Sequence, residues 1–366
     1  MAAIFVIGSN GSGQLGIGHQ EDVSVPKQAI LHPEPESSAI TKIAAGGNHT
    51  LILFKSGELY WSGDASTGAC GLTSDINLEQ KVFRLARLTS DPSALRQTSI
   101  VSVAATWEAS FILTRDTDGK TAVYAFGSGP KGELGLGDLP AEILRTPSAT
   151  LIPNFPPAGT QVKDLASSVG HVIALLDNGD VYGWGNGRKG QLGEPCGFVK
   201  APRKVDGLSF PVSKAVCGRE FTCLVGEPDT GEILVLGSDK WEVRSKAPAS
   251  VRGWRDVGAG WGNINVLFDS GILLNWGRND HGQLVPPNLP KVSKLAVGSE
   301  HVVCLSEKGE VLTWGWGEHG NCGPSAEIDI KGKWNVIAST KFIPKEVHIT
   351  GVGAGCATSW VIITPR

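Results

Sequence analysis

Three features are missing from this chain of 366 residues, and each absence excludes a class of protein. No apolar run is long enough to span a bilayer, so we expect no membrane-spanning helix. No block of lysine and arginine occurs, and the net charge of −3 argues against direct binding to nucleic acid. Stretches with helical periodicity are scarce, whereas short β-branched runs bounded by Gly, Asn or Asp are frequent. An all-β protein is therefore predicted.

The seven cysteines lack any Cys-x-x-Cys pair, and their odd number does not fit a disulfide framework. Free, mostly buried thiols are typical of a cytosolic protein. The first five residues lack the charged and apolar regions of a signal peptide and are interpreted as the start of a strand. We predict a cytoplasmic protein, with the nucleus as a further location.

Glycine is abundant, with 48 residues, and many of them recur at fixed places in a repeated motif. The motif reads Trp-Gly-x-Gly-x-x-Gly-Gln-Leu-Gly; three copies are clear, two are close to them and two are degenerate. The seven copies begin at Phe5, Leu59, Tyr124, Tyr182, Leu234, Leu274 and Leu312. Such self-similarity indicates a solenoid, a propeller or an array, because one unit cannot bury its own apolar face.

A second motif alternates with the first and reads apolar-Ala-x-Gly-x-x-His, followed by four apolar residues and a turn. Its copies begin at Ile43, Val103, Leu165, Ala215, Val257, Leu295 and Val352. Each copy predicts two antiparallel strands that meet at the Gly loop and end in a hairpin turn.

The ends of the chain carry one motif each, because the chain opens with the first motif alone and closes with the second alone. Joining the two ends completes a seventh unit and removes the open sheet edges. We predict one domain over residues 1–366, an all-β, seven-bladed β-propeller closed by pairing of the N- and C-terminal strands. Ile4–Gly8 should lie beside Ser359–Ile363.

This alternation of Gly-x-x-His with Trp-Gly-x-Gly-x-x-Gly-Gln-Leu-Gly resembles the regulator of chromosome condensation repeat family over essentially the whole chain. The opening segment 8–23 is similar to one branch of it, the fungal killer-toxin-insensitivity or alpha-tubulin suppressor proteins. The resemblance implies a scaffold that forms a heterodimer with a small zinc- or iron-binding protein of diphthamide synthesis. It also implies support for diphthamide formation on elongation factor and for Elongator-dependent modification of tRNA wobble uridines, with the Elongator complex as a further partner.

No motif predicts catalysis or a cofactor. Segment 8–13 superficially resembles a phosphate loop, but no Gly-Lys-Ser/Thr follows it and it recurs as a turn in the repeats. Segment 116–119 resembles a calcium loop that lacks its closing Glu. His49, His171 and His301 occupy one position in three repeats, so in a ring they face different neighbours and do not converge on a metal. We predict a non-enzyme without cofactor or metal, in which these histidines make structural hydrogen bonds.

Tryptophans divide into two groups. One group lies in strand runs and is predicted to be core; it comprises Trp184, Trp276 and Trp314, with Ile7, Phe126 and Leu236 at the same slot in other repeats, and also Trp254 and Trp360. Trp107 and Trp261 instead occupy the Gly-His loop, where most repeats carry a smaller residue.

The Gly-His loops should converge on one face around the central channel. Trp and Arg in polar company are typical anchors of protein interfaces; the alternative is that each ring folds over its own loop as a lid on the channel. The predicted partner-binding face comprises Trp107, Glu108, Arg219, Glu220, Trp261, Asn263, Glu300, Trp316 and His319.

Three function classes stay open at this point. The first is an interaction module for the small metal-binding protein. The second is a guanine nucleotide exchange factor or regulator for a small GTPase, which would predict a basic, chromatin-directed tail that the first strand near Ile4 leaves no room for. The third is a glycan- or small-molecule-binding propeller, which needs an acid-rich channel mouth.

Overall fold

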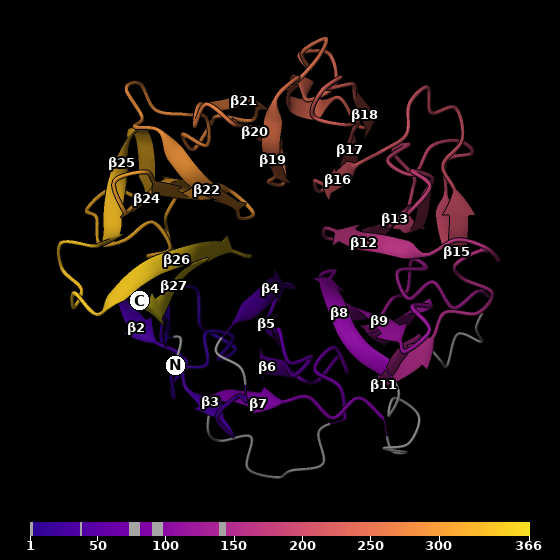
Figure 1. Cartoon of the computed structure of the whole chain (residues 1–366), viewed down its shortest axis with the longest axis horizontal. Helices are drawn as coiled ribbons and strands as arrows, with labels where there is room; N and C mark the ends of the chain where they lie inside the picture. Colours follow the sequence, from indigo (N-terminus) through magenta and orange to yellow (C-terminus); the bar gives the residue numbers. More distant parts are fainter. Residues whose placement is uncertain (1–2, 37–38, 73–80, 90–97, 139–143) are drawn as a thin grey trace.

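A computed structural model describes residues 3–36, 39–72, 81–89, 98–138 and 144–366 of the chain. Seven β-sheets stand around a central opening, and the two ends of the chain lie side by side (Figure 1). The predicted all-β propeller with seven blades is therefore confirmed. Among the described residues, no helix is long and apolar enough to cross a membrane.

The blades follow one another along the chain. Blade 1 contains β4 (Ile40–Ala45), β5 (His49–Phe54), β6 (Leu59–Gly63), β7 (Phe83–Leu85) and β3 (Leu31–His32). Blade 2 contains β8 (Thr98–Ala105), β9 (Ala109–Asp116), β10 (Thr121–Ser128) and β11 (Arg145–Leu151). Blade 3 contains β12 (Val162–Ser167), β13 (His171–Leu176), β14 (Val181–Asn186) and β15 (Phe198–Lys204).

The next two blades are smaller. Blade 4 contains β16 (Lys214–Cys217), β17 (Phe221–Val225) and β18 (Ile233–Gly237). Blade 5 contains β19 (Trp254–Ala259), β20 (Asn263–Phe268) and β21 (Leu273–Gly277). A short turn of helix, η2 (Lys240–Glu242), follows blade 4. Blade 6 again has four strands, β22 (Val292–Val297), β23 (His301–Ser306), β24 (Glu310–Trp316) and β25 (Asp329–Ser339).

Blade 7 closes the ring with strands from both ends of the chain. Its order is β2 (Val23–Gln28), β1 (Ala3–Gly8), β27 (Thr358–Pro365) and β26 (Val347–Ala354). Ile4 pairs with Ile362 and Ile7 with Ser359, antiparallel, so the predicted pairing of the terminal strands is confirmed.

The glycine that follows the in-strand Trp slot has a steric reason. Gly185 in β14 has φ of +98°, and a Cβ there would collide with the carbonyl oxygen of Gly170, the residue just before β13. The equivalent glycine meets a carbonyl oxygen in the same way in every blade. A side chain at this position would push the second and third strands of a blade apart, which explains why the repeat keeps Gly there.

Three histidines, in blades 1, 3 and 6, each form a hydrogen bond to the following blade. His49 Nε2 lies 2.9 Å from Ser110 Oγ, and His171 Nε2 lies 3.0 Å from Thr222 Oγ1. His301 Nε2 lies 2.9 Å from Ser359 Oγ. Each hydroxyl in turn donates to a loop carbonyl, as Thr222 does to Gln191 at 2.8 Å. The predicted structural role of these histidines is confirmed, because each faces a different neighbouring blade.

Most of the predicted core is buried. Trp184, Trp314 and Trp360 are fully buried, and Trp254 and Trp276 are 8% and 7% exposed. Leu236 is the exception, because it is only partly buried. It lies in β18, where blade 4 has no fourth strand within the described residues to cover it. The seven cysteines are free, and five of them are buried, as expected.

Candidate functional site

The loops between the first and second strands of the blades lie at one face and are bonded to one another in two arcs. In the first arc, Gly47 N–H donates to Trp107 O at 2.9 Å and Trp107 N–H donates to Val169 O at 3.0 Å. The second arc runs through Arg219, Trp261, Ser299 and Gly355, with N–H to carbonyl distances of 3.2, 2.8 and 3.1 Å. The loops converge around the channel because the blades are arranged in a ring. The backbone hydrogen bonds hold each loop against the loop of the neighbouring blade.

Trp107 and Trp261 come from blades 2 and 5 and meet across the mouth of the channel. Their ring centroids are 5.9 Å apart with planes tilted by 46°. Trp107 also lies against Gly47 of blade 1, where a Cβ would come within 2.5 Å of the ring. Trp107 nevertheless stays 38% exposed. Together the two rings form a lid over the channel mouth, and its outer side is exposed at Trp107.

Arg219 and Glu220 extend this surface next to Trp261. The Arg219 guanidinium lies 5.2 Å from the centre of the Trp261 ring, a cation–π contact. Both side chains line a cavity that Trp241, 39% exposed, closes on the other side. This part of the face combines aromatic rings with free charges.

Arg278 lies beside Trp241 and is held by two carboxylates. Its guanidinium is 4.9 Å from the centre of the Trp241 ring, bonds Asp280 at 2.7 and 2.8 Å, and pairs with Glu300. Gln283 Nε2 donates to both carboxylates, at 3.1 Å to Asp280 and 2.7 Å to Glu300. The guanidinium is therefore fixed in position and its charge is matched.

The two carboxylates shift in opposite directions because their burial differs. Burial raises the pKa of Glu300, whose side chain is 6% exposed, although Gln283 and Arg278 act to lower it. Burial also acts to raise the pKa of Asp280, but the hydrogen bonds from Arg278 and Gln283 lower it to about 2. The Arg278–Asp280 pair thus persists over the whole physiological range of pH.

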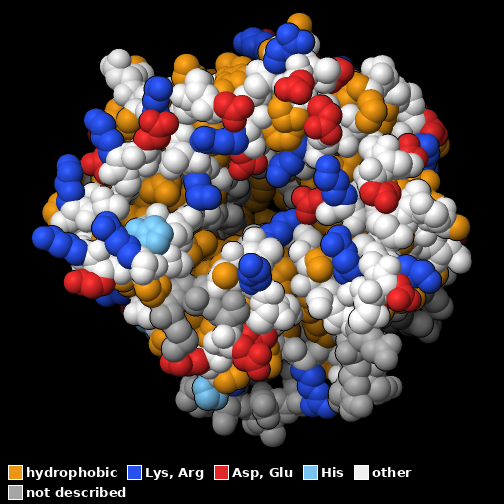
Figure 2. Space-filling view, in the orientation of Figure 1, with side chains coloured by type: hydrophobic (Ala, Val, Ile, Leu, Met, Phe, Trp, Pro, Cys, Tyr) orange, Lys and Arg blue, Asp and Glu red, His pale blue; other side chains and the backbone are white. Residues whose placement is uncertain are grey.

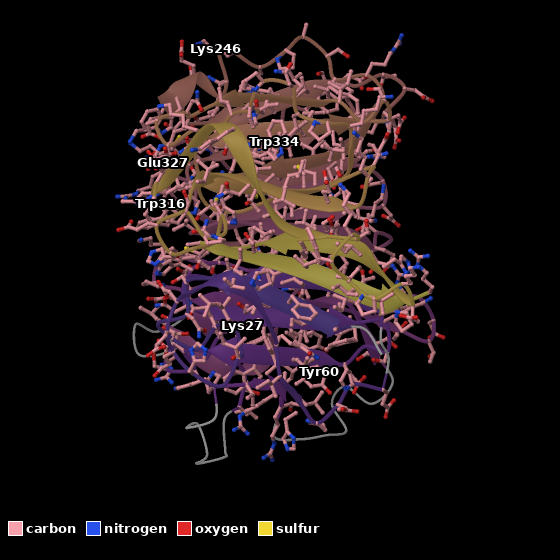
Figure 3. The ribbon with its side chains drawn as sticks, turned by 90° about the vertical axis from the view of Figure 1, so that its left-hand side faces the viewer. Lys27, Tyr60, Lys246, Trp316, Glu327 and Trp334 are labelled. Atoms are coloured by element: carbon pink, nitrogen blue, oxygen red, sulfur yellow. The ribbon has the colours of Figure 1, made fainter. Side chains whose placement is uncertain are left out.

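Trp316 and His319 continue the face toward blade 7. Trp316 N–H donates to Glu300 O at 2.9 Å, and the Trp316 ring lies 5.6 Å from His319 and 6.1 Å from His281. His319 Nδ1 lies 2.7 Å from Asp22 of the opening segment. In the side view, Trp316 and Glu327 lie at the same edge of the disc (Figure 3). The two predicted residues are therefore connected to the tryptophan lid through Glu300.

Two of the predicted residues lie below the surface. Asn263 is 2% exposed and Glu300 is 5% exposed, so neither presents its side chain to a partner. Asn263 occupies the slot that holds His in blades 1, 3 and 6, where the backbone directs the side chain between blades. Glu300 acts through Arg278 instead. Glu108 is exposed beside Trp107, as expected.

Sequence reasoning missed Lys240, Trp241 and Arg278. Lys240 and Trp241 end the degenerate copy that begins at Leu234, and Arg278 follows the Trp-Gly of the next copy. A Trp at a loop position that other repeats fill with Gly or a polar residue was the available signal, the same one that identified Trp107 and Trp261.

The central channel lies behind the lid. Its cavity of about 310 Å³ is lined largely by small residues of the inner strands. Lys42 Nζ bonds Asp164 at 2.9 Å and Ser102 at 3.0 Å there. Burial acts to raise the pKa of Asp164, but the charge and hydrogen bond of Lys42 lower it below its ordinary value. Figure 2 shows the hollow at the centre of the disc with Lys and Arg side chains along its rim. With tryptophans over one mouth and an ion pair within, the channel does not have the acid-rich mouth of a glycan site.

Metal ions require several ligand side chains grouped around one point. Across the described ranges, no three His, Cys, Asp or Glu side chains are grouped so that they could hold a metal ion. Burial lowers the pKa of His49, His171 and His301 to about 4, so these rings are neutral at physiological pH. What the face offers is aromatic and charged surface for another molecule to contact.

Fold and loop face together define a repeat-built β-propeller with an aromatic and charged loop face. A family model described as the RCC1-like domain matches residues 3–361, and the chain belongs to that family, the regulator of chromosome condensation repeat family. An RCC1 repeat-containing protein of Schizosaccharomyces pombe is 32% identical over 98% of this chain and 97% of the relative. The secretion-regulating guanine nucleotide exchange factor of Mus musculus is 28% identical over 77% of this chain, and the match covers 61% of that protein.

Solved structures agree with the fold. Prp20p of Saccharomyces cerevisiae matches with a TM-score of 0.82 at 22% identity, over 100% of this chain and 92% of that one. Human WBSCR16 matches with a TM-score of 0.80 at 19% identity, over 100% and 99% of the two chains. At these identities the likeness is one of architecture.

Proposed function

We propose that this propeller is a non-catalytic scaffold that binds a protein partner on the face around Trp107 and Trp261. The observation that carries the proposal is the contact of these two rings across the channel mouth, with one of them 38% exposed. Exposed aromatic rings flanked by Arg are typical hot spots of protein interfaces, and the fold core does not need them.

One candidate partner is a small GTPase, on which the propeller would act as a guanine nucleotide exchange factor. The support is the 28% identical mouse relative, which is named as such a factor. The match covers 61% of that protein, and we therefore propose the exchange activity for this chain on the basis of the shared part.

The other candidate is the small zinc- or iron-binding protein of diphthamide synthesis. Its support is the resemblance of segment 8–23, whose Asp22 contacts His319 on the same face. Binding of this partner would let the propeller support diphthamide formation on elongation factor and, with the Elongator complex, modification of tRNA wobble uridines. The protein would then act in the cytoplasm, with a nuclear pool.

Titration calorimetry with each purified partner tests the proposal. Trp107→Ala or Trp261→Ala should weaken binding by about 2 kcal/mol or more, because truncation removes a hot-spot ring, while the melting temperature changes little. Release of labelled GDP distinguishes exchange on a GTPase from simple binding of the small metal-binding protein.

Trp184→Ala and Trp276→Ala are the matched controls, since the same residue type is buried in the core. They should cost about 3–5 kcal/mol of folding stability and leave the affinity per folded molecule unchanged. If Trp107→Ala and Trp261→Ala behave like these controls, the two rings are structural lids and the interface lies elsewhere.

A further inference from the structure

A cavity of about 350 Å³ lies on the tryptophan face where the loops of blades 4 and 5 meet. Trp261 and Trp241 form two of its walls, and Arg219, Lys240, Arg278 and Glu300 line the rest together with Glu220. The volume is at the lower end of the range for ligand sites, which suits one or two side chains of a partner.

We propose that this cavity receives an acidic side chain of the protein partner, and that Arg219 and Lys240 hold its carboxylate. The inference rests on the proposed function, because it names the chemistry of the group that the partner inserts.

The charges of the cavity are not all free. Arg278 is occupied by Asp280 and Glu300. Arg219 and Lys240 are exposed and form no ion pair with any described residue. Two cations are therefore available at the cavity, against one unpaired carboxylate, that of Glu220.

The aromatic walls hold these cations in place. Arg219 lies 5.2 Å from the centre of the Trp261 ring, and Lys240 Nζ lies 5.2 Å from the centre of the Trp241 ring. A basic group of a partner would find both ring faces already occupied by positive charge. A carboxylate would instead accept hydrogen bonds from a guanidinium and an ammonium, which are stronger than bonds between neutral groups.

The backbone at Trp241 is strained in a way that shapes this wall. Trp241 and Glu242 have φ of +68° and +58°, a conformation that is uncommon and strained for a bulky side chain. It brings the Trp241 ring against Gly262, where a Cβ would lie 3.0 Å from the ring and 2.9 Å from Arg278 Cβ. Such strain persists where the surroundings fix it, and here it builds the side of the cavity opposite Trp261.

Fluorescence anisotropy with two labelled probes, a hexaglutamate and a hexalysine peptide, tests the charge preference. The wild-type chain should bind hexaglutamate and not hexalysine, and Arg219→Glu with Lys240→Glu should weaken the binding of hexaglutamate at least tenfold. Arg219→Gln with Lys240→Gln should reduce the affinity for hexaglutamate to a value between those of the wild type and the Glu double variant. This neutral variant avoids any effect of charge reversal on folding. Lys294→Glu is the matched control, because Lys294 is exposed within β22 and is not among the residues that line the cavity.

Equal binding of hexaglutamate by the Arg219/Lys240 variants and the wild type overturns the inference, as does tighter binding of hexalysine. The inference is also overturned if Lys294→Glu weakens hexaglutamate binding as much as the Arg219/Lys240 variants do, since the peptide would then be attracted by the overall charge and not by the cavity. Titration with the partner separates the two proposals. If Trp107→Ala weakens the complex and the Arg219/Lys240 variants do not, the partner binds the tryptophan face without inserting an acidic side chain into the cavity. If Trp107→Ala has no effect, the proposed function fails.

Discussion

Blades 4 and 5 differ from blades 1, 3 and 6 in three respects at the same place. Each has three strands, neither has a His at the position that bonds one blade to the next, and their loops carry Arg219, Trp241 and Trp261. Blades 1, 3 and 6 have four or five strands, keep the His and show none of these loop residues. The comparison teaches that the repeat is relaxed where the candidate site is built, as expected when function and regular packing compete for the same residues.

The bond between neighbouring blades shows the same division. Where a His is present, the next blade supplies a hydroxyl, as in His171 with Thr222. Blade 4 has Phe221 at the position of the His, and blade 5 has Ile264 at the position of the hydroxyl residue. An apolar pair therefore replaces the polar one. Between blades 5 and 6, Asn263 faces the position of Val302, and the Asn263 amide nitrogen is buried without a hydrogen-bond partner.

The largest effect should come from removing a middle strand from a complete blade. Deletion of residues 350–366 removes β27, which lies between β1 and β26, and with it most of β26. We expect loss of cooperative unfolding and of solubility, because blade 7 would expose unpaired strand edges and leave the ring open. Blades 4 and 5 are formed without an outer strand. We therefore expect outer strands to be dispensable for folding and middle strands to be essential. Thermal melts followed by circular dichroism measure the effect.

A circular permutant provides the control for this deletion. Linking residues 366 and 1 and opening the chain at the exposed Gly207 keeps every strand. Its melting temperature should stay near that of the parent. A normal melt in the 350–366 deletion contradicts the closure argument.

Acid sensitivity should reside in the complete blades. The pKa of His171 is about 4 in the fold and about 6.5 when unfolded, so the unfolded chain binds the proton first as the pH falls. The stability that depends on the neutral ring is present above pH 6.5 and is lost as the pH falls toward 4, by about 2 kcal/mol for each such histidine at pH 5. Denaturant titrations at pH 7 and pH 5 measure this loss.

Copying the apolar pair of blades 4 and 5 sharpens the test. His171→Phe with Thr222→Ile should remove about a third of the loss between pH 7 and pH 5, because His49 and His301 have the same lowered pKa and remain. An unchanged pH dependence in this variant would mean that other groups cause the acid sensitivity.

The smallest effect should come from repairing the irregular bond between blades 5 and 6. Asn263→His with Val302→Thr copies the His171–Thr222 pair, and should stabilise the fold by about 1 kcal/mol, since it replaces an unpaired buried amide by a hydrogen bond. Denaturant titration at pH 7 measures it. Asn263→His alone is the control and should not stabilise the fold, because the ring would face Val302 and lack a hydroxyl partner; a stabilised single variant would contradict the pairing rule.

The repeated parts of this structure could be predicted from the sequence, because each motif residue has a local steric reason. Gly185 and its equivalents mark the third strand, and the motif order at the two ends gave the closure of blade 7. The missing strands of blades 4 and 5 could not be predicted, since the outer strand has no recurrent residue in the motif.

The candidate site was predicted in part. Trp107 and Trp261 stood out because they are large residues in a loop slot of mostly smaller ones. Their contact with each other depends on how loops from blades 2 and 5 bend toward the axis, which no spacing encodes. Trp241 takes its place through backbone dihedrals that are unusual for tryptophan, so propensity could not anticipate it.

The two hydrogen-bonded arcs of loops contact each other at the channel mouth through the rings of Trp107 and Trp261. Trp107 lies on one arc and Trp261 on the other, and no described backbone bond joins Val169 to Arg219. The blades that carry the arcs are packed together, since Leu165 and Val172 of blade 3 share one buried cluster with Ala215 and Leu224 of blade 4. Separating the arcs would therefore disrupt the core, whereas rotation of one ring about its side-chain bonds would break a single ring contact, worth about 0.5–1.5 kcal/mol. Access to the channel from this face thus depends on the rotamers of two side chains and not on movement of the blades.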